Sequence, residues 1–187
     1  MEASAVSRNK TLDMVYIALF AVLIAICSWI SIPTSIPFTL QTFGIFVTVG
    51  VLGGKRGSFA VFIYLLLGAI GVPVFAGFSG GMGVLLGTTG GYIIGFLASA
   101  LVMWLMEKVL GRKTWVLALS MVLGLIVCYA IGTAWFMIVY GKNIGSIGLA
   151  AALGMCVVPF IIPDVIKIVL ALIVANRVSK LMKLNLN

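Results

Sequence analysis

The sequence contains no histidine, and its three cysteines lie far apart without a CxxC spacing. The missing imidazole removes the commonest general base and metal ligand, and the cysteine pattern indicates neither a metal site nor a disulfide. An intramembrane protease would need a nucleophile–base pair or a metal site, and the sequence offers neither. We therefore expect no enzyme activity, no catalytic residue, no metal and no cofactor, with Cys27, Cys128 and Cys156 as buried, inert thiols.

A nucleotide-binding loop is also missing. The stretch 50–56 (GVLGGKR) carries glycines before a lysine, but the first glycine has the wrong offset and Arg56 stands where Ser or Thr is required. If ATP drives any process here, another subunit must supply the nucleotide-binding site. No basic patch with interleaved aromatic residues is present, so we expect no nucleic-acid partner.

Charge is scarce, at 9% of residues, whereas 63% are hydrophobic and the mean hydropathy is +1.30. A soluble domain has about a quarter of its residues charged, so the composition predicts an integral protein in contact with membrane lipid. Since one helical span takes ~20 residues, the chain holds about six. We predict an all-α fold, a single compact bundle of six transmembrane helices, with spans at 14–31, 40–53, 58–72, 90–107, 115–140 and 160–180.

The few charges predict the orientation of this bundle. With six spans, ten of the twelve Lys and Arg residues fall on one side, Lys142 falls on the other, and Lys167 lies inside the last span. Cytoplasmic loops of membrane proteins are enriched in Lys and Arg. We therefore expect both termini to be cytoplasmic, and the loops 32–39, 73–90 and 141–147 to face outward.

The stretch 148–182 is too long for one crossing, because it would extend roughly 52 Å as a helix against a ~30 Å hydrocarbon core. Pro159 and Pro163 are expected to break it. We predict a partial helix over 148–158 and a final helix that begins near Pro163, since proline suits the first helical turn.

Asp164 and Lys167 stand three residues apart in the apolar stretch 159–174. This spacing places both side chains on one helical face. Ionisable residues inside a membrane are costly and indicate function by default. The alternative is a structural ion pair that neutralises itself against a neighbouring helix, and we favour the functional interpretation.

The segment 68–92 is rich in glycine, uncharged and apolar, and eight of the 22 glycines lie from Gly77 to Gly95. Glycine allows backbone to approach a ligand closely, and irregular backbone at membrane depth is tolerated when it lines a cavity. A folded lid over a small apolar ligand fits this composition better than a flexible surface loop. A weaker signal is the stretch 37–43 (PFTLQTF), where Thr and Gln open a short span.

Ala18, Ala21 and Ala25 give the first span a surface of small residues. Small residues at i and i+4 let two helices approach closely in lipid. Ala21 and Ala25 therefore predict a helix contact, either within the bundle or with a partner chain.

Four motifs together closely resemble the BioY family, the biotin-specific substrate-binding (S) components of energy-coupling factor (ECF) transporters. They are PFTLQTF at 37–43, YLLLGAIGVPVFAG at 64–77, GVLLGTTGGY at 83–92 and PFIIPDVIK at 159–167. The resemblance covers roughly residues 14–180. It implies high-affinity binding of biotin near the extracellular face, and biotin uptake across the cell membrane of a prokaryote.

The resemblance also implies partners and site residues. The partners would be a transmembrane coupling subunit, contacted through Ala21 and Ala25, and two ATPase subunits. An S component for another small vitamin and a carrier or channel that works without partners are the alternatives. Residues implied to bind biotin are Asp164, Lys167, Ser79, Gly80, Gly81, Tyr92, Phe38, Gln41, Phe75, Phe78 and Thr88.

Overall fold

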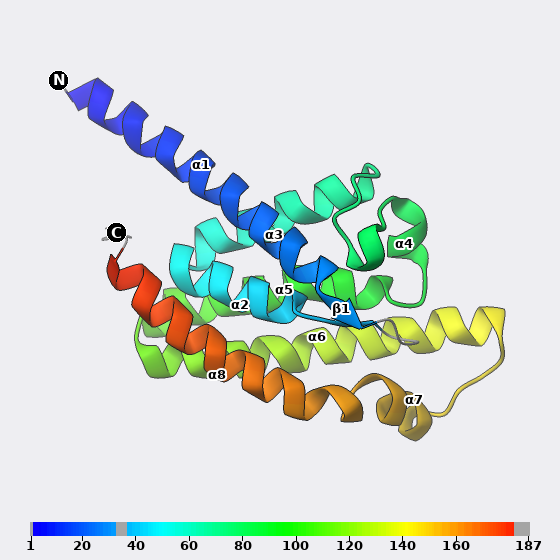
Figure 1. Cartoon of the computed structure of the whole chain (residues 1–187). Helices are drawn as coiled ribbons and strands as arrows, with labels where there is room; N and C mark the ends of the chain where they lie inside the picture. Colours follow the sequence, from blue (N-terminus) through cyan, green and yellow to red (C-terminus); the bar gives the residue numbers. More distant parts are fainter. Residues whose placement is uncertain (1, 33–36, 182–187) are drawn as a thin grey trace.

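The computed structural model describes residues 2–32 and 37–181, with side chains for 10–32 and 37–180. Part of the outer loop 32–39 and the C-terminal residues from 182 on lie outside the described chain, and no side chain is described for residues 2–9. The described chain is helical apart from a short hairpin and its turns, so the all-α prediction is confirmed (Figure 1). The helices are α1 (Glu2–Trp29), α2 (Gln41–Leu52), α3 (Gly54–Ala69), η1 (Ala76–Phe78), α4 (Met82–Leu86), α5 (Gly90–Leu110), α6 (Thr114–Asn143), α7 (Leu149–Cys156) and α8 (Val158–Leu181), and the hairpin strands are β1 (Ser31–Ile32) and β2 (Phe38–Thr39).

Within the described residues, four helical segments are long and apolar enough to cross a membrane: Lys10–Trp29, Gly90–Leu110, Thr114–Asn143 and Val158–Lys180. Large apolar side chains such as Ile162 (74% exposed) point outward from them, as expected for surfaces that meet lipid. Helices α2 and α3 have 12 and 16 residues and are separated by Gly53 alone. Both are shorter than the ~20 residues of a full span, so the count of six spans stays a prediction.

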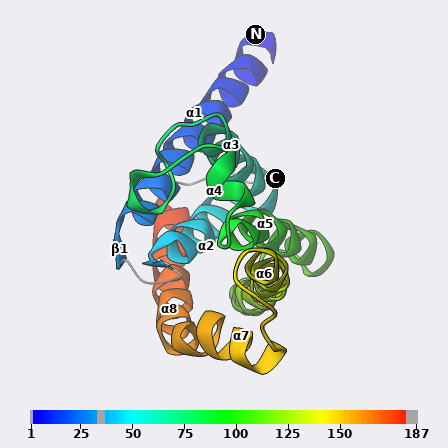
Figure 2. The same ribbon diagram turned by 90° about the vertical axis from the view of Figure 1, so that its right-hand side faces the viewer.

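Helix α2 forms the centre of the bundle. Ten of its twelve residues are buried, and it packs against α1, α3, α5 and α8. A view turned by 90° shows α2 enclosed by the longer helices (Figure 2). Helix α2 carries no charged residue, and a helix without a charged face is found in a protein interior. The central position of α2 therefore agrees with its composition.

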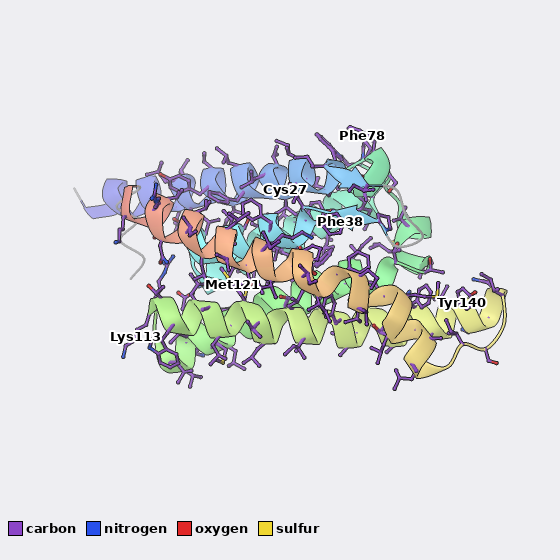
Figure 3. All side chains as sticks on the ribbon, turned by 60° about the horizontal axis from the view of Figure 1, so that its bottom comes forward. Cys27, Phe38, Phe78, Lys113, Met121 and Tyr140 are labelled. Atoms are coloured by element: carbon purple, nitrogen blue, oxygen red, sulfur yellow. The ribbon has the colours of Figure 1, made fainter. Side chains whose placement is uncertain are left out.

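The bundle has two chemically different ends. The N- and C-terminal ends of the described chain lie at the same end (Figure 1), where Lys113 is also found (Figure 3). The hairpin, η1, α4 and the connection to α7 lie at the opposite end. The glycine-rich segment therefore folds over the end away from most of the basic residues.

The structure corrects the predicted start of the last helix. Helix α8 begins at Val158, and Pro163 lies inside it. Pro159 occupies the first turn, where the missing N–H has no helical acceptor to lose, so the helix starts about one turn earlier than expected. The partial helix expected before it is found as α7.

The structure shows one helix contact that the alanines of α1 make. Ala21 and Ala25 are 2% and 3% exposed, because α1 packs against α2 and α3. They form a contact within the bundle, and the contact with a partner chain that the resemblance implied stays a prediction. Ala18, one turn away from Ala21, remains exposed.

Candidate functional site

The ion pair predicted in the last span is present on α8. Lys167 Nζ lies 2.7 Å from Asp164 Oδ1, and the two residues are 5% and 3% exposed. Three residues of helix bring both side chains to the face that meets the bundle interior. Taking such charges out of water is costly, and the cost is repaid only when the remaining donors and acceptors are also bonded.

Two other helices complete the bonding of this carboxylate. Thr42 of α2 donates from Oγ1 to Asp164 Oδ1 at 3.2 Å. Tyr129 of α6 donates its hydroxyl to Asp164 Oδ2. Helices α2, α6 and α8 therefore meet at a single side chain, whose position is fixed from three directions.

Lys167 also rests on an aromatic surface supplied by the hairpin. Its Nζ lies 4.2 Å from the centre of the Phe38 ring, a distance typical of a cation–π contact. Phe38 in turn stacks on Phe160 of α8, with ring centres 6.0 Å apart. The predicted residue Phe38 is thus brought to the ion pair.

A small cavity of about 60 Å³ opens beside the ion pair. Its walls are aromatic and apolar, with hydroxyl groups and the two charges at one side. It is lined by Pro37, Thr39, Thr42, Tyr92, Phe96, Cys128, Tyr129, Cys156, Phe160, Asp164 and Lys167.

A second compartment of about 140 Å³ adjoins the first under the glycine-rich segment. The two share Pro37, Thr39, Tyr92 and Phe96, and we call them together the Asp164 cleft. The second compartment is otherwise lined by Gln41, Phe75, Ala76, Ser79, Val84, Thr89 and Ile93.

Polar side chains of this second compartment form hydrogen bonds within the protein. Gln41 donates from Nε2 to the Tyr64 hydroxyl at 2.7 Å, and the Ser79 hydroxyl donates to the Ala76 carbonyl oxygen at 2.8 Å. Tyr92, on the wall between the compartments, exchanges a 3.0 Å hydrogen bond with Thr133. A cleft that is mostly apolar, with a few fixed polar groups, is the usual form of a small-molecule site.

Four of the residues implied to bind the ligand lie elsewhere. Phe78 is 65% exposed and stacks on Trp29, with ring centres 4.9 Å apart, at the outer edge of the molecule (Figure 3). Thr88 is replaced in the lining by its neighbour Thr89. Gly80 and Gly81 lie outside both linings. A Cβ at Gly80 would meet the Val72 carbonyl oxygen at 2.4 Å, and Gly81 has φ +94°, so both shape the turn.

Sequence reasoning missed Tyr129, although its hydroxyl stands in a mostly apolar stretch of α6. A buried tyrosine hydroxyl usually finds a partner, and that rule was the available signal. It also missed the wall formed by Phe96, Cys128 and Cys156, which looks like ordinary span sequence. The three cysteines are free and buried, as predicted, and two of them line the cleft.

The fold and the cleft together define a helical membrane protein with an internal cleft of the form that small-molecule sites usually take. The family model that matches this chain is BioY, over residues 1–184. The chain therefore belongs to the BioY family.

Relatives of known name support this assignment. A biotin transporter BioY of Thermotoga maritima is 43% identical over 90% of this chain and 96% of that protein. A probable biotin transporter BioY of Pyrococcus horikoshii is 41% identical over 91% of this chain and 98% of that protein. The crystal structure of the S component for biotin from an ECF-type ABC transporter superposes with a TM-score of 0.82, at 30% identity, over 92% of this chain and 93% of that one.

Proposed function

We propose that this chain binds biotin in the Asp164 cleft and serves in biotin uptake across the cell membrane as the S component of an ATP-driven ECF transporter. The observation that carries the proposal is the buried Asp164–Lys167 pair, which opens on a cleft with aromatic walls. The names of its relatives identify the ligand.

The chemistry of biotin matches the two kinds of surface in the cleft. Biotin carries two ureido N–H donors, a ureido carbonyl, an apolar ring and a terminal carboxylate. An ionised carboxylate offers about four acceptor sites and an ammonium offers three donors, so Asp164 and Lys167 can each bind the ligand while they remain paired. Phe75 and Tyr92 line the cleft and supply apolar surface for the bicyclic ring. Phe38 lies against Lys167, and Gln41 and Ser79 line the second compartment.

The orientation proposed for the chain follows from its two ends. We propose that α1, α5, α6 and α8 each cross the membrane and that α2 and α3 supply two further crossings, six in all. The basic end would then be cytoplasmic, by the enrichment of Lys and Arg on that side. The glycine-rich segment and the Asp164 cleft would lie toward the outer face.

We further propose that the chain is powered by partners, namely a transmembrane coupling subunit and two ATPase subunits. The support is the name of its structural neighbour, an S component of an ECF-type ABC transporter. It agrees with the unsuitable offset of the only loop in this sequence that approaches a nucleotide motif.

Calorimetry on the purified chain tests the ligand and the site together. We expect saturable biotin binding by the unchanged protein and its loss in Asp164→Asn, which removes the charge but keeps the shape. Asp13→Asn is the matched control, because Asp13 pairs with Arg56 at 3.0 Å outside the cleft. This variant should bind biotin normally.

Each contrary outcome has a separate meaning. If the unchanged chain does not bind biotin, and mass spectrometry of the purified protein identifies another vitamin, the ligand is wrong. If Asp164→Asn is folded by circular dichroism and binds biotin fully, the site is wrong.

A further inference from the structure

We propose that Tyr64 is a positioning residue of the Asp164 cleft. It fixes the direction of the Gln41 side-chain amide, so that Gln41 Oε1 faces the ligand and selects a hydrogen-bond donor. The inference rests on the proposed function, because it concerns how the same cleft recognises biotin. Tyr64 lines neither compartment of the cleft, so it acts on the ligand through Gln41.

Tyr64 lies on α3 and is completely enclosed, with 0% of its surface exposed. Its ring meets the Phe75 ring edge-on, with ring centres 5.6 Å apart. Its hydroxyl accepts a 2.7 Å hydrogen bond from Gln41 Nε2. Phe75 and Gln41 both line the second compartment. One buried side chain therefore supports two residues of the cleft wall from behind.

Gln41, the first residue of α2, is 4% exposed. An amide has a donor end and an acceptor end, so its direction decides what it offers to a ligand. Its Nε2 points to Tyr64, and among the described residues nothing donates to its Oε1. Within the described chain, the buried side-chain atoms that lack a partner are the hydroxyl oxygens of Ser58 and Ser99. Gln41 Oε1 is therefore not sealed in the core, and it is left for a group in the second compartment.

The direction of this amide is set by the order of the protons behind it. Ser28 of α1 directs its only hydroxyl proton to backbone carbonyl oxygens, those of Ala25 and Val74. The Tyr64 hydroxyl also interacts with the Ser28 side chain. Since Ser28 has no further proton, Tyr64 must donate to it. The Tyr64 oxygen then only accepts, and the partner that meets it has to be the amide NH2 of Gln41.

The carbonyl that ends this series of hydrogen bonds belongs to the glycine-rich segment. Val74 is 6% exposed, and the neighbouring Pro73 carbonyl oxygen accepts a 2.9 Å hydrogen bond from Trp29 Nε1. The Phe75 ring lies so close to α3 that a Cβ at Gly68 would be 2.0 Å from its Cζ. The segment is thus fastened to α1 and α3, and Ser28 donates to a fixed acceptor.

A hydrogen-bond acceptor in the second compartment matches the donors of biotin. These donors are its two ureido N–H groups, and the Gln41 carbonyl oxygen can accept from one of them. If the amide were turned round, its NH2 would meet the same N–H and two donors would oppose each other. A site built to bond a ligand group rejects an analogue that lacks the group, because its own polar group is then left unpaired.

Calorimetry on the purified full chain tests the proposal with biotin and two analogues of the same size. In each analogue an oxygen atom replaces one of the two ureido N–H groups. Tyr64→Phe keeps the ring on Phe75 and removes the hydroxyl. We expect it to weaken biotin binding about fivefold, the usual effect of one neutral hydrogen bond. Tyr140→Phe is the control, because Tyr140 lines neither compartment, and it should bind biotin as the unchanged protein does.

The analogues separate positioning from packing. With the hydroxyl removed, the Gln41 amide can turn its NH2 toward the new oxygen of one analogue. Tyr64→Phe should therefore leave the affinity for that analogue unchanged or raise it. The preference for biotin over that analogue should narrow about fivefold, the same factor by which biotin binding weakens. A packing defect would instead weaken biotin and both analogues alike.

Two further variants test the same series of hydrogen bonds. In a Gln41→Leu background there is no amide to direct, so Tyr64→Phe should not weaken biotin binding further. Ser28→Ala leaves Tyr64 in place and frees the Tyr64 proton, which lets the Gln41 amide turn. It should narrow the same preference, and it tests the proposal even if Tyr64→Phe does not fold by circular dichroism.

The contrary outcomes are distinct. If the unchanged chain does not bind biotin, the proposed function is wrong and the positioning role is wrong with it. If the unchanged chain binds biotin but Tyr64→Phe and Ser28→Ala weaken all three ligands equally, only the positioning role is overturned. The same conclusion follows if Tyr64→Phe costs as much affinity in the Gln41→Leu background as it does alone.

Discussion

At the scale of single residues, the Asp164 carboxylate holds the site together. It accepts from an ammonium on its own helix, from a hydroxyl on α2 and from a hydroxyl on α6. Each bond offsets part of the cost of burying the charge. The same bonds fix the direction of the carboxylate before any ligand arrives, which lowers the entropic cost of binding.

Tyr129→Phe should weaken biotin binding about tenfold or more, because a hydrogen bond to a charged group contributes about 1.5–3 kcal/mol and each 1.4 kcal/mol is a factor of about ten. The substitution leaves the ring in place and removes only the hydroxyl that holds Asp164 Oδ2. Calorimetry measures the change. Tyr140→Phe makes the same chemical change on the same helix, where the ring packs on Phe136, and should bind as the unchanged protein does. Equal affinity of both variants would refute this role for Tyr129.

Lys167→Met should destabilise the folded chain by about 3–5 kcal/mol, because it leaves a buried carboxylate without its counter-ion. Thermal unfolding in detergent measures this effect. The double variant Asp164→Asn with Lys167→Met carries neither charge and should recover most of the stability. It should still fail to bind biotin. A double variant that binds normally would reduce the ion pair to a structural feature.

At the scale of elements, helices α5 and α6 approach closely because glycines face large side chains. A Cβ at Gly132 of α6 would lie 2.2 Å from Tyr92 Cδ1, and one at Gly91 of α5 would lie 2.1 Å from Trp135 Cβ. Neither distance is compatible with a side chain, so the ring of Tyr92 needs the glycine opposite to it. The wall between the two compartments of the cleft therefore depends on the spacing of these helices.

Gly132→Ala should push the Tyr92 ring out of place, lower the stability of the chain and weaken biotin binding. Overpacking of this kind typically costs about 1–3 kcal/mol. Gly141→Ala is the control on the same helix, because a Cβ there meets nothing within 4 Å. It should be neutral or slightly stabilising, since alanine favours helix over glycine. Unfolding temperatures and titrations of both variants decide the matter.

The sequence was enough to predict the helices because their cause is local. Continuous apolar runs bounded by charge or proline predicted every long helix. The prolines in the last, overlong run also predicted the break after α7. The start of α8 was placed wrongly because two prolines a turn apart compete for the same role, and only the packing of the first turn decides between them. The short α2 could be located, but its place at the centre depends on contacts with four other helices.

The candidate cleft could be located from the sequence where its chemistry is unusual, and not where it is ordinary. Two charges in an apolar helix predicted the buried Asp164–Lys167 pair, which the structure confirms, and their role in binding stays a prediction. The wall of Phe96, Cys128 and Cys156 consists of residues that any span contains, so only the three-dimensional arrangement separates them from core. Phe78 was assigned to the cleft by its position in a motif, and the turn directs its ring to Trp29 on the outside.

At the scale of the whole molecule, the two ends have different tasks. The Asp164 cleft is lined by residues of the hairpin and of the glycine-rich segment, whereas the termini and Lys113 lie at the opposite end. The helical bundle lies between the candidate site and this basic end. This separation suits a protein that captures a ligand on one side of the membrane and is acted on by partners at the other.

We therefore expect the chain to need its partners for net uptake. Reconstituted alone in liposomes, it should bind biotin but not accumulate it against a gradient, whether or not ATP is enclosed. With the coupling subunit and both ATPase subunits, ATP should drive accumulation, and Asp164→Asn should abolish it while Asp13→Asn preserves it. Filter assays with radiolabelled biotin measure both states. Accumulation by the chain alone would indicate a self-sufficient carrier, because coupling to ATP would then be unnecessary for transport.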